Sequence, residues 1–131
     1  MSMQSPKTII RQWIETGLDI GEVDRVEIFF SPTYVCPGVQ GTAALKGTLR
    51  TMRHAFPDLH VRIEELIAEQ DTVVARLAYS GTHRGPFMQR QPTGKNLNWT
   101  GVAIYRIADG MIIEEWAIWD HTFILQLDGI G

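Results

Sequence analysis

The sequence predicts an α+β fold in which three helices precede a strongly curved, mainly antiparallel sheet. Two observations predict this class. In residues 6–56 apolar side chains recur at spacings of three to four, which is typical of amphipathic helices. From residue 59 onward the apolar residues are mostly β-branched or aromatic and are divided by turn residues, as in strands. Helices segregated before a sheet indicate the α+β class, and a curved sheet wrapped over them would enclose a pocket.

The first helix begins at Ser5-Pro6, because serine is a good N-cap and proline suits the first helical position. Its apolar stripe contains Ile9, Ile10, Trp13, Ile14 and Leu18, with glycines at 17 and 21 near its end. We expect this stripe to face the sheet.

Two further helices are expected before the sheet. The second covers Val23 to Phe30 and is stopped by Ser31-Pro32, after which residues 34–38 read as a loop. The third covers Thr42 to Ala55 and is ended by Pro57-Asp58. Its inward stripe consists of Leu45, Leu49, Met52 and Phe56.

The second half of the chain predicts a meander of long antiparallel strands. Asp109-Gly110 is a hairpin signal, and the loop 81–94 contains prolines and glycines that separate two strands. A short final helix would hold Phe123, Ile124 and Leu127. The expected strands are residues 59–69, 72–80, 98–107 and 111–120.

Bulk composition indicates one domain over residues 1–131, which is too short for two ordinary domains. A net charge of -3 argues against a generic nucleic-acid binder, and no apolar run is long enough to cross a membrane. The N-terminus lacks the pattern of a signal peptide, and the single cysteine, Cys36, cannot form an internal disulfide. A cytoplasmic location is therefore expected.

The last expected strand, IIEEWAIWDH (112–121), is apolar on both faces. Because side chains alternate along a strand, Ile112, Glu114, Trp116, Ile118 and Asp120 would share one face, which we expect to line the pocket. The other face would carry Ile113, Glu115, Ala117 and Trp119. We expect a homodimer to cover this outer face, burying Ala117 and Trp119.

Asp120 has two interpretations from the residues alone. Beside Trp116 and Ile118 its carboxylate would be partly desolvated, which would raise its pKa and suit proton transfer. Alternatively, it caps the final helix by accepting backbone N–H groups of residues 122 or 123.

Five pieces of the chain, in order, resemble the SnoaL-like polyketide cyclases of the NTF2-like superfamily, whose fold is a cone-shaped α+β barrel. They are FPDLHV (56–61), SGTHRGPF (80–87), PTGK (92–95), YRIADGMI (105–112) and EEWAIWD (114–120). With the helical half in register, the resemblance covers nearly the whole chain. The sequence departs from it after Tyr34-Val35, where Cys36-Pro37 stands and many relatives have a histidine.

This resemblance implies a small enzyme that needs no metal or cofactor. In the characterised cyclases the aspartate of the last motif is the general acid/base of an intramolecular aldol ring closure, a role that falls here on Asp120. The substrate would be a hydrophobic carbonyl compound, and no nucleic acid or membrane partner is implied. The alternative is a non-catalytic small-molecule-binding domain that keeps the cavity.

His83 is the second catalytic candidate, because it lies at a strand end beside the 81–94 loop and could position a substrate carbonyl or share a proton with Asp120. It could equally be a structural histidine. The remaining histidines are expected at the surface, and their spacing excludes a zinc site. A hydrolase built on Cys36, His83 and Asp120 lacks a nucleophile signature.

Aromatic residues could line a cavity for a flat, apolar ligand, although core packing explains each of them singly. The candidate substrate-binding residues are Tyr34, Phe56, Phe87, Trp99, Trp116 and Ile118. The acid pairs Glu64-Glu65 and Glu114-Glu115 are expected to be solvated. Glu114 is the possible exception, because the alternation of side chains puts it on the same strand face as Asp120.

Overall fold

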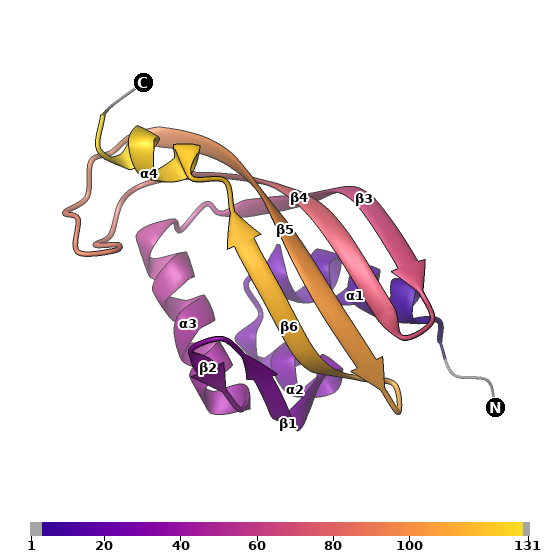
Figure 1. Ribbon diagram of the computed structural model, residues 1–131. Coiled ribbons are helices and arrows are strands. Elements are labelled where there is room, and N and C mark those ends of the chain that lie inside the picture. Colours follow the sequence, from indigo (N-terminus) through magenta and orange to yellow (C-terminus); the bar gives the residue numbers. More distant parts are fainter. Residues whose placement is uncertain (1–3, 130–131) are drawn as a thin grey trace.

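The computed structural model describes residues 4–129 of the chain and combines helices with one six-stranded sheet (Figure 1). The first half contains α1 (Pro6–Trp13), the π-helix η1 (Ile14–Leu18), the 3₁₀-helix η2 (Val23–Arg25), α2 (Val26–Phe29), β1 (Phe30–Cys36), β2 (Val39–Gln40) and α3 (Thr42–Ala55). The second half contains β3 (His60–Glu69), β4 (Thr72–Thr82), β5 (Asn96–Ala108), β6 (Met111–Trp119) and α4 (Thr122–Leu127).

The sheet has the strand order β2-β1-β6-β5-β4-β3, and every neighbouring pair is antiparallel except β1 and β6, which are parallel. Figure 1 shows α1, α2 and α3 together on one side of this bent sheet, with α4 at its upper end. The α+β prediction is confirmed, including three N-terminal helical segments on one face. The sheet remains open, with β2 and β3 at its edges.

The first helix begins as the sequence predicts. The Ser5 hydroxyl accepts the N–H of Thr8 at 3.2 Å, and Pro6 occupies the first turn. After Trp13 the helix widens into the π-helix η1, and the Asp19 N–H reaches the Ile14 carbonyl. A Cβ on Gly17 would lie 2.4 Å from the Trp13 ring, so glycine lets this indole pack across the turn.

The segment after α2 departs from the prediction. The helix ends at Phe29, and Phe30 to Cys36 form a strand where the sequence predicted a helix end followed by a loop. The pairing of β1 with β6 shifts register between Phe30 and Val35. Pro32 lies in this irregular stretch, which is where a sheet tolerates a residue without an N–H.

The predicted strands β4 and β5 alternate between buried and less buried residues. Val73, Ala75 and Leu77 are fully buried on the helix side, and Ala103 and Tyr105 of β5 are nearly so. Asp109 and Gly110 both have positive φ in the turn to β6. This is the hairpin turn that Asp-Gly favours.

A bulge in β6 overturns the predicted parity of that strand. Ile107 pairs with Ile112, whereas Arg106 pairs with Glu114, so Ile113 is an extra residue in β6. Ile112 is fully buried, but beyond the bulge the inward positions are occupied by odd-numbered residues. The prediction that Ile112, Glu114, Trp116 and Ile118 share one face was therefore wrong.

As a result, the two faces of the end of β6 are exchanged. Trp116 and Ile118 lie on the outer face of the sheet and are 54% and 76% exposed, so they do not line an internal pocket. Ala117 and Trp119 line a cavity on the helix side of the sheet, so the prediction that they lie on the outer face was wrong.

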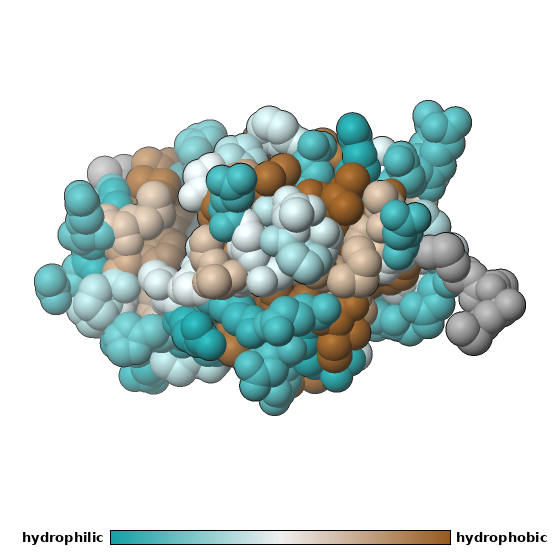
Figure 2. Space-filling view, turned by 90° about the horizontal axis from the view of Figure 1, so that it is seen from below, coloured by the Kyte–Doolittle hydropathy of each residue, from teal (hydrophilic) through white to brown (hydrophobic). Residues whose placement is uncertain are grey.

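The surface seen from below in Figure 2 is mixed: hydrophobic areas come to the surface between hydrophilic side chains. Scattered exposed apolar residues are normal for a folded domain. In the described part of the chain, no helix is long and apolar enough to cross a membrane.

Candidate functional site

A cavity of about 320 Å³ lies between the helices and the inner face of the sheet. Its size falls within the range of small-molecule sites, which begins at roughly 300 Å³. Its walls are largely apolar, with a few polar groups from the strands. The lining residues are Trp13, Leu18, Tyr34, Cys36, Val39, Leu45, Thr48, Leu49, Met52, Tyr79, Tyr105, Glu115, Ala117 and Trp119.

Glu115 is the carboxyl group among these lining residues. Its Oε1 accepts a hydrogen bond from the Tyr34 hydroxyl at 2.8 Å. Burial raises the pKa of Glu115, while hydrogen bonds from Tyr34 and Tyr105 partly oppose that rise. A carboxyl group whose pKa moves toward neutrality can both accept and donate a proton, which is what general acid/base catalysis requires.

Three tyrosines, Tyr34, Tyr79 and Tyr105, line the cavity with this carboxyl group. Burial and the charge of Glu115 raise the pKa of Tyr34 and of Tyr105 far above the ordinary value. Burial raises the pKa of Tyr79 to about 12. All three phenols therefore stay protonated while Glu115 titrates, and each can donate a hydrogen bond.

The pairing of β1 with β6 brings this group together. Val35 pairs with Glu114, and Tyr34, which precedes Val35, contacts Glu115 diagonally across the two parallel strands on the inner face. The bulge at Ile113 is what turns Glu115 inward. The prediction that Glu115 is solvated was wrong, because it assumed an uninterrupted strand.

Cys36 also lines the cavity, at the end of β1. Burial raises the pKa of its thiol, and the charge of Glu115 raises it further. A raised pKa keeps the sulfur protonated, and the thiolate is the nucleophilic form.

Asp120 lies outside this cavity, just beyond β6. Its backbone N–H donates to the Thr100 carbonyl at 2.8 Å, and its Oδ1 accepts the N–H of Thr122 at 2.9 Å. The hydrogen bonds from Thr122 lower the pKa of Asp120, whereas its place beside Trp116 and Ile118 in the sequence predicted a raised pKa. The carboxyl borders outer surface grooves and makes the capping contact of the alternative interpretation. Its role as acid/base stays a prediction.

His83 is completely buried and directly follows the end of β4. The Thr93 N–H donates to its Nδ1 at 3.3 Å, which places the ring proton of the neutral form on Nε2. Within the described chain, Nε2 has no hydrogen-bond partner, and burial lowers the His83 pKa. The ring packs on Phe56 at a centroid distance of 5.6 Å, and His83 does not line the cavity of Glu115.

Three of the predicted pocket aromatics belong to a packed cluster instead. Phe56 lies 5.5 Å from Phe87 and 5.2 Å from Trp99 between ring centroids. Tyr79 stacks on Trp99 at 5.5 Å, and Trp119 contacts the same indole at 5.3 Å, which joins the cluster to the cavity. Of the six predicted substrate-binding residues, Tyr34 alone lines the cavity with Glu115.

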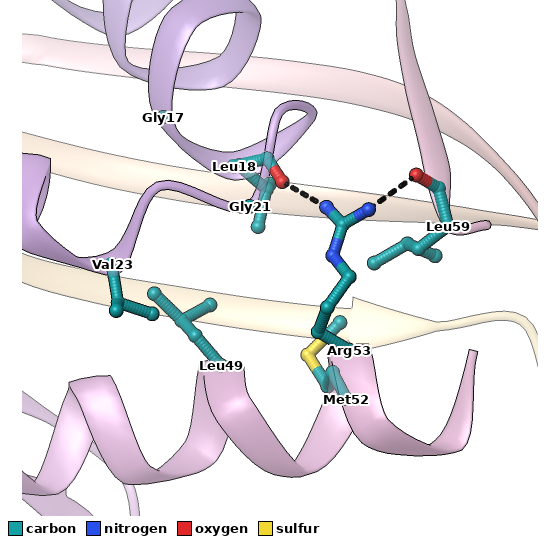
Figure 3. A pocket seen from close by; sticks show the side chains of 8 residues that line it. All are labelled: Gly17, Leu18, Gly21, Val23, Leu49, Met52, Arg53 and Leu59. Atoms are coloured by element: carbon teal, nitrogen blue, oxygen red, sulfur yellow. Dashed lines mark hydrogen bonds between the residues drawn. The ribbon is translucent and has the colours of Figure 1, made fainter. Parts of the chain in front are cut away.

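A smaller hollow lies beside η1 and α3 and is shown in Figure 3. Arg53 crosses it, and its guanidinium donates to the carbonyls of Leu18 and Asp19 from one side and Leu59 from the other. Because the donors of Arg53 are engaged with backbone, this arrangement ties η1 to α3 and β3. We assign it a structural role.

No group of three or more His, Cys, Asp or Glu residues in the described chain is arranged to hold a metal ion. The polar groups of the cavity are phenols, one thiol, one carboxyl and the Thr48 hydroxyl. Such a set can hold and move a proton on a bound organic molecule.

Comparison with known families gives a match over residues 8–126 to the model of the SnoaL-like polyketide cyclase family. No curated protein matches the chain significantly.

Solved structures share this fold. AclR of Streptomyces galilaeus, a candidate hydroxylase, is 26% identical with a TM-score of 0.84, over 98% of this chain and 84% of its own. A candidate polyketide cyclase of Acidithiobacillus ferrooxidans is 26% identical with a TM-score of 0.82, over the full length of both chains. A SnoaL-like polyketide cyclase of Agrobacterium tumefaciens is 21% identical with a TM-score of 0.84, over 95% of this chain and 98% of its own. The family match and the shared fold agree: the chain belongs to the SnoaL-like polyketide cyclase family.

Proposed function

We propose that this protein is a small acid/base enzyme that acts on a hydrophobic carbonyl compound bound in the cavity, with Glu115 as the proton-transferring group. The observation that carries the proposal is the half-buried Glu115 carboxyl on the wall of an apolar cavity, held by the Tyr34 hydroxyl. Membership in a cyclase family supports the reaction class but does not identify a substrate.

The proposed reaction needs only proton transfer. The Glu115 carboxylate removes a proton from a carbon next to a carbonyl, and the hydroxyls of Tyr79 or Tyr105 donate to the enolate oxygen that forms. In an aldol closure the enolate carbon attacks a second carbonyl of the same molecule. Glu115 then returns its proton to the new alkoxide, so no atom is gained or lost and no cofactor takes part.

Asp120 is the rival acid/base, implied by the family resemblance. Its lowered pKa and its capping bond to Thr122 favour a structural role over proton transfer near neutrality. The two assignments predict opposite results for two isosteric variants, so they can be separated directly.

The test compares Glu115→Gln, Asp120→Asn and the wild type on a panel of β-dicarbonyl and enone substrates. Glu114→Gln is the matched control, because Glu114 is the neighbouring carboxyl on the outer face, next to Arg106. We expect Glu115→Gln to lose about 10²- to 10⁴-fold in kcat and the other two variants to retain it. Loss confined to Asp120→Asn would move the role to Asp120, and unimpaired turnover in both would contradict acid/base catalysis by either residue.

The second candidate function is a non-catalytic small-molecule-binding domain. The cavity itself favours it, since a volume of about 320 Å³ with mostly apolar walls suits binding with or without turnover. Saturable binding of panel compounds without turnover by the wild type would support this function.

The proposal includes a cytoplasmic homodimer. In place of Ala117 and Trp119, the outer face offers two apolar cross-strand pairs, Val102 with Ile118 and Ile104 with Trp116. A second copy could cover these four exposed side chains by packing sheet against sheet. The single cysteine supports a reducing compartment.

A further inference from the structure

The cavity gathers weak acids and lacks bases. Its titratable lining groups are the carboxyl of Glu115, the phenols of Tyr34, Tyr79 and Tyr105, and the Cys36 thiol. No lysine, arginine or histidine of the described chain lines it. A ligand that carries a carboxylate or a phosphate would therefore meet no compensating charge there, whereas a cation would meet a carboxylate.

Aromatic side chains form much of the cavity wall. Trp13 comes from α1, Tyr79 and Tyr105 from the central strands, and Trp119 from β6. The rings of Tyr79 and Trp119 are 5.4 Å apart and inclined by 57°, so they form a corner rather than a flat stack. Electron-rich ring faces attract an organic cation, and several rings around one ammonium group are a recurrent recognition device.

The opposite wall is aliphatic. Leu45, Leu49 and Met52 of α3 face the cavity beside the Thr48 hydroxyl, with Leu18 from η1. This side can bury hydrocarbon but offers little to a second charged group. The cavity is thus polar and anionic at one end and apolar at the other.

We propose that the cavity binds hydrophobic amines as their ammonium ions, with the nitrogen against Glu115 and the tyrosine and tryptophan rings, and the hydrocarbon body against α3. This binding goes beyond the proposed carbonyl chemistry and does not depend on it, because Glu115 acts here only as a charge. An amine would also compete with any carbonyl substrate for the same space.

Binding should be linked to the ionisation of Glu115. Because burial raises the Glu115 pKa, its carboxyl keeps its proton to a higher pH than an ordinary glutamate does. An ammonium ion favours the carboxylate, so a protonated Glu115 would release its proton on binding, and affinity should rise with pH.

The other titratable groups that line the cavity should not change their charge over the pH range of this effect. All four have raised pKa values and stay protonated between about pH 5 and pH 8. They are Tyr34 and Cys36 on β1, Tyr79 on β4 and Tyr105 on β5. The residues contributed by α1, η1, β2 and α3 carry no titratable side chain into the cavity. A pH-dependent affinity would thus report on Glu115.

The test uses matched probes that differ in charge: 2-naphthylmethylamine, 2-naphthylmethanol and 2-naphthoate. Their binding to the intact protein is measured by titration calorimetry. For the wild type near pH 8 we expect the amine to bind at least about tenfold more tightly than the alcohol, with the carboxylate weakest. In Glu115→Gln the preference for the amine should disappear, and in the matched control Glu114→Gln it should remain.

A second measurement keeps the proposal testable if Glu115→Gln does not fold. The N,N,N-trimethyl derivative of the amine is permanently charged, so any rise of its wild-type affinity between about pH 5 and pH 8 reflects the protein. We expect such a rise for this probe and none for the alcohol. Equal affinity for the amine and the alcohol, or a flat profile for the charged probe, would overturn the proposal.

The outcomes separate this inference from the proposed enzymatic function. Preferred amine binding without turnover of carbonyl compounds would refute the enzyme and leave the amine site standing. Turnover that depends on Glu115, with no preference for the amine, would refute the amine site and leave the enzyme standing.

Discussion

The Tyr34 hydroxyl donates to Oε1 of Glu115 across 2.8 Å, although 81 positions separate the two residues in the chain. The bond joins β1 to β6 at their parallel pairing. Because the Tyr34 hydrogen bond stabilises the ionised carboxyl, it lowers the pKa that burial raises. Tyr34 thus sets the pH range in which Glu115 can act as a base.

Replacing Tyr34 with phenylalanine should therefore shift the pH dependence of turnover. Without the hydroxyl the Glu115 pKa rises further, so the ascending limb of kcat/KM against pH should move to higher pH, with a smaller change at its plateau. Tyr79→Phe is the matched control, since Tyr79 lines the same cavity without a hydrogen bond that lowers the Glu115 pKa. A shift of the limb to lower pH in Tyr34→Phe would contradict this role.

Replacing Glu115 with glutamine should change how stability depends on pH. The folded pKa of Glu115 lies above its ordinary value near 4.5, so the native protein holds this proton more tightly than the unfolded chain. Its contribution is fully present below the unfolded pKa and is lost as pH rises through the folded pKa. The melting temperature of Glu115→Gln, relative to the wild type, should increase from pH 4 to pH 8.

The same melting series needs a control for the other carboxyls. Asp58 and Asp120 have lowered pKa values, so their protonation at acid pH destabilises the wild type and the variant alike. They cancel in the difference between variant and wild type, and Glu114→Gln should show no such trend. A difference that is constant across the range would mean that Glu115 ionises normally in the folded state.

Much of the fold could be predicted from local patterns. The first helix, the third helix and the hairpin at Asp109-Gly110 follow from spacing, caps and turn residues, and these lie where the sequence indicates. The strand β1 could not be predicted in this way, because it contains Pro32 and depends on a distant partner, β6. Short strands with non-local pairing leave little local signal.

The candidate site was harder to predict, because one extra residue in β6 determines which side chains face the cavity. Parity assigns faces correctly only along an unbroken pleat, and the bulge at Ile113 moves every later side chain of β6 to the other face. That shift brings Glu115 into the cavity and puts Trp116 outside. Three inward tyrosines on other strands were the available signal that a polar group belonged opposite them.

The exposed apolar pairs on the outer face of the sheet predict a homodimer, and one charged side chain introduced there should prevent it from forming. Arg76 lies near Glu65 and Arg106 near Glu114, at 3.4 and 3.8 Å, so the charges around the apolar pairs are largely compensated within one chain. We expect the wild type to have twice the mass of the 14.8 kDa chain in sedimentation equilibrium. Ile118→Arg should give the monomer mass.

The matched control for this prediction is Ile20→Arg. Ile20 is 59% exposed but follows η1 on the helical side, away from the sheet face, so this change should leave the dimer intact. A monomeric wild type, or a dimer that survives Ile118→Arg, would contradict the proposed interface.

Two glycines predict opposite effects of the same substitution on stability. A Cβ on Gly101 would lie 2.9 Å from both the Ile118 carbonyl and the Trp119 ring, so Gly101→Ala should destabilise the protein by about 1–3 kcal/mol and disturb a wall of the cavity. Gly47 lies within α3 with nothing near its added Cβ, so Gly47→Ala should stabilise it by about 0.4–1 kcal/mol, because alanine favours the helix and restricts the unfolded chain. Urea unfolding monitored by tryptophan fluorescence measures both changes. Equal stability of the two variants would mean that Trp119 and β6 move away from the added Cβ at little cost in free energy. That result would contradict the tight packing of this cavity wall.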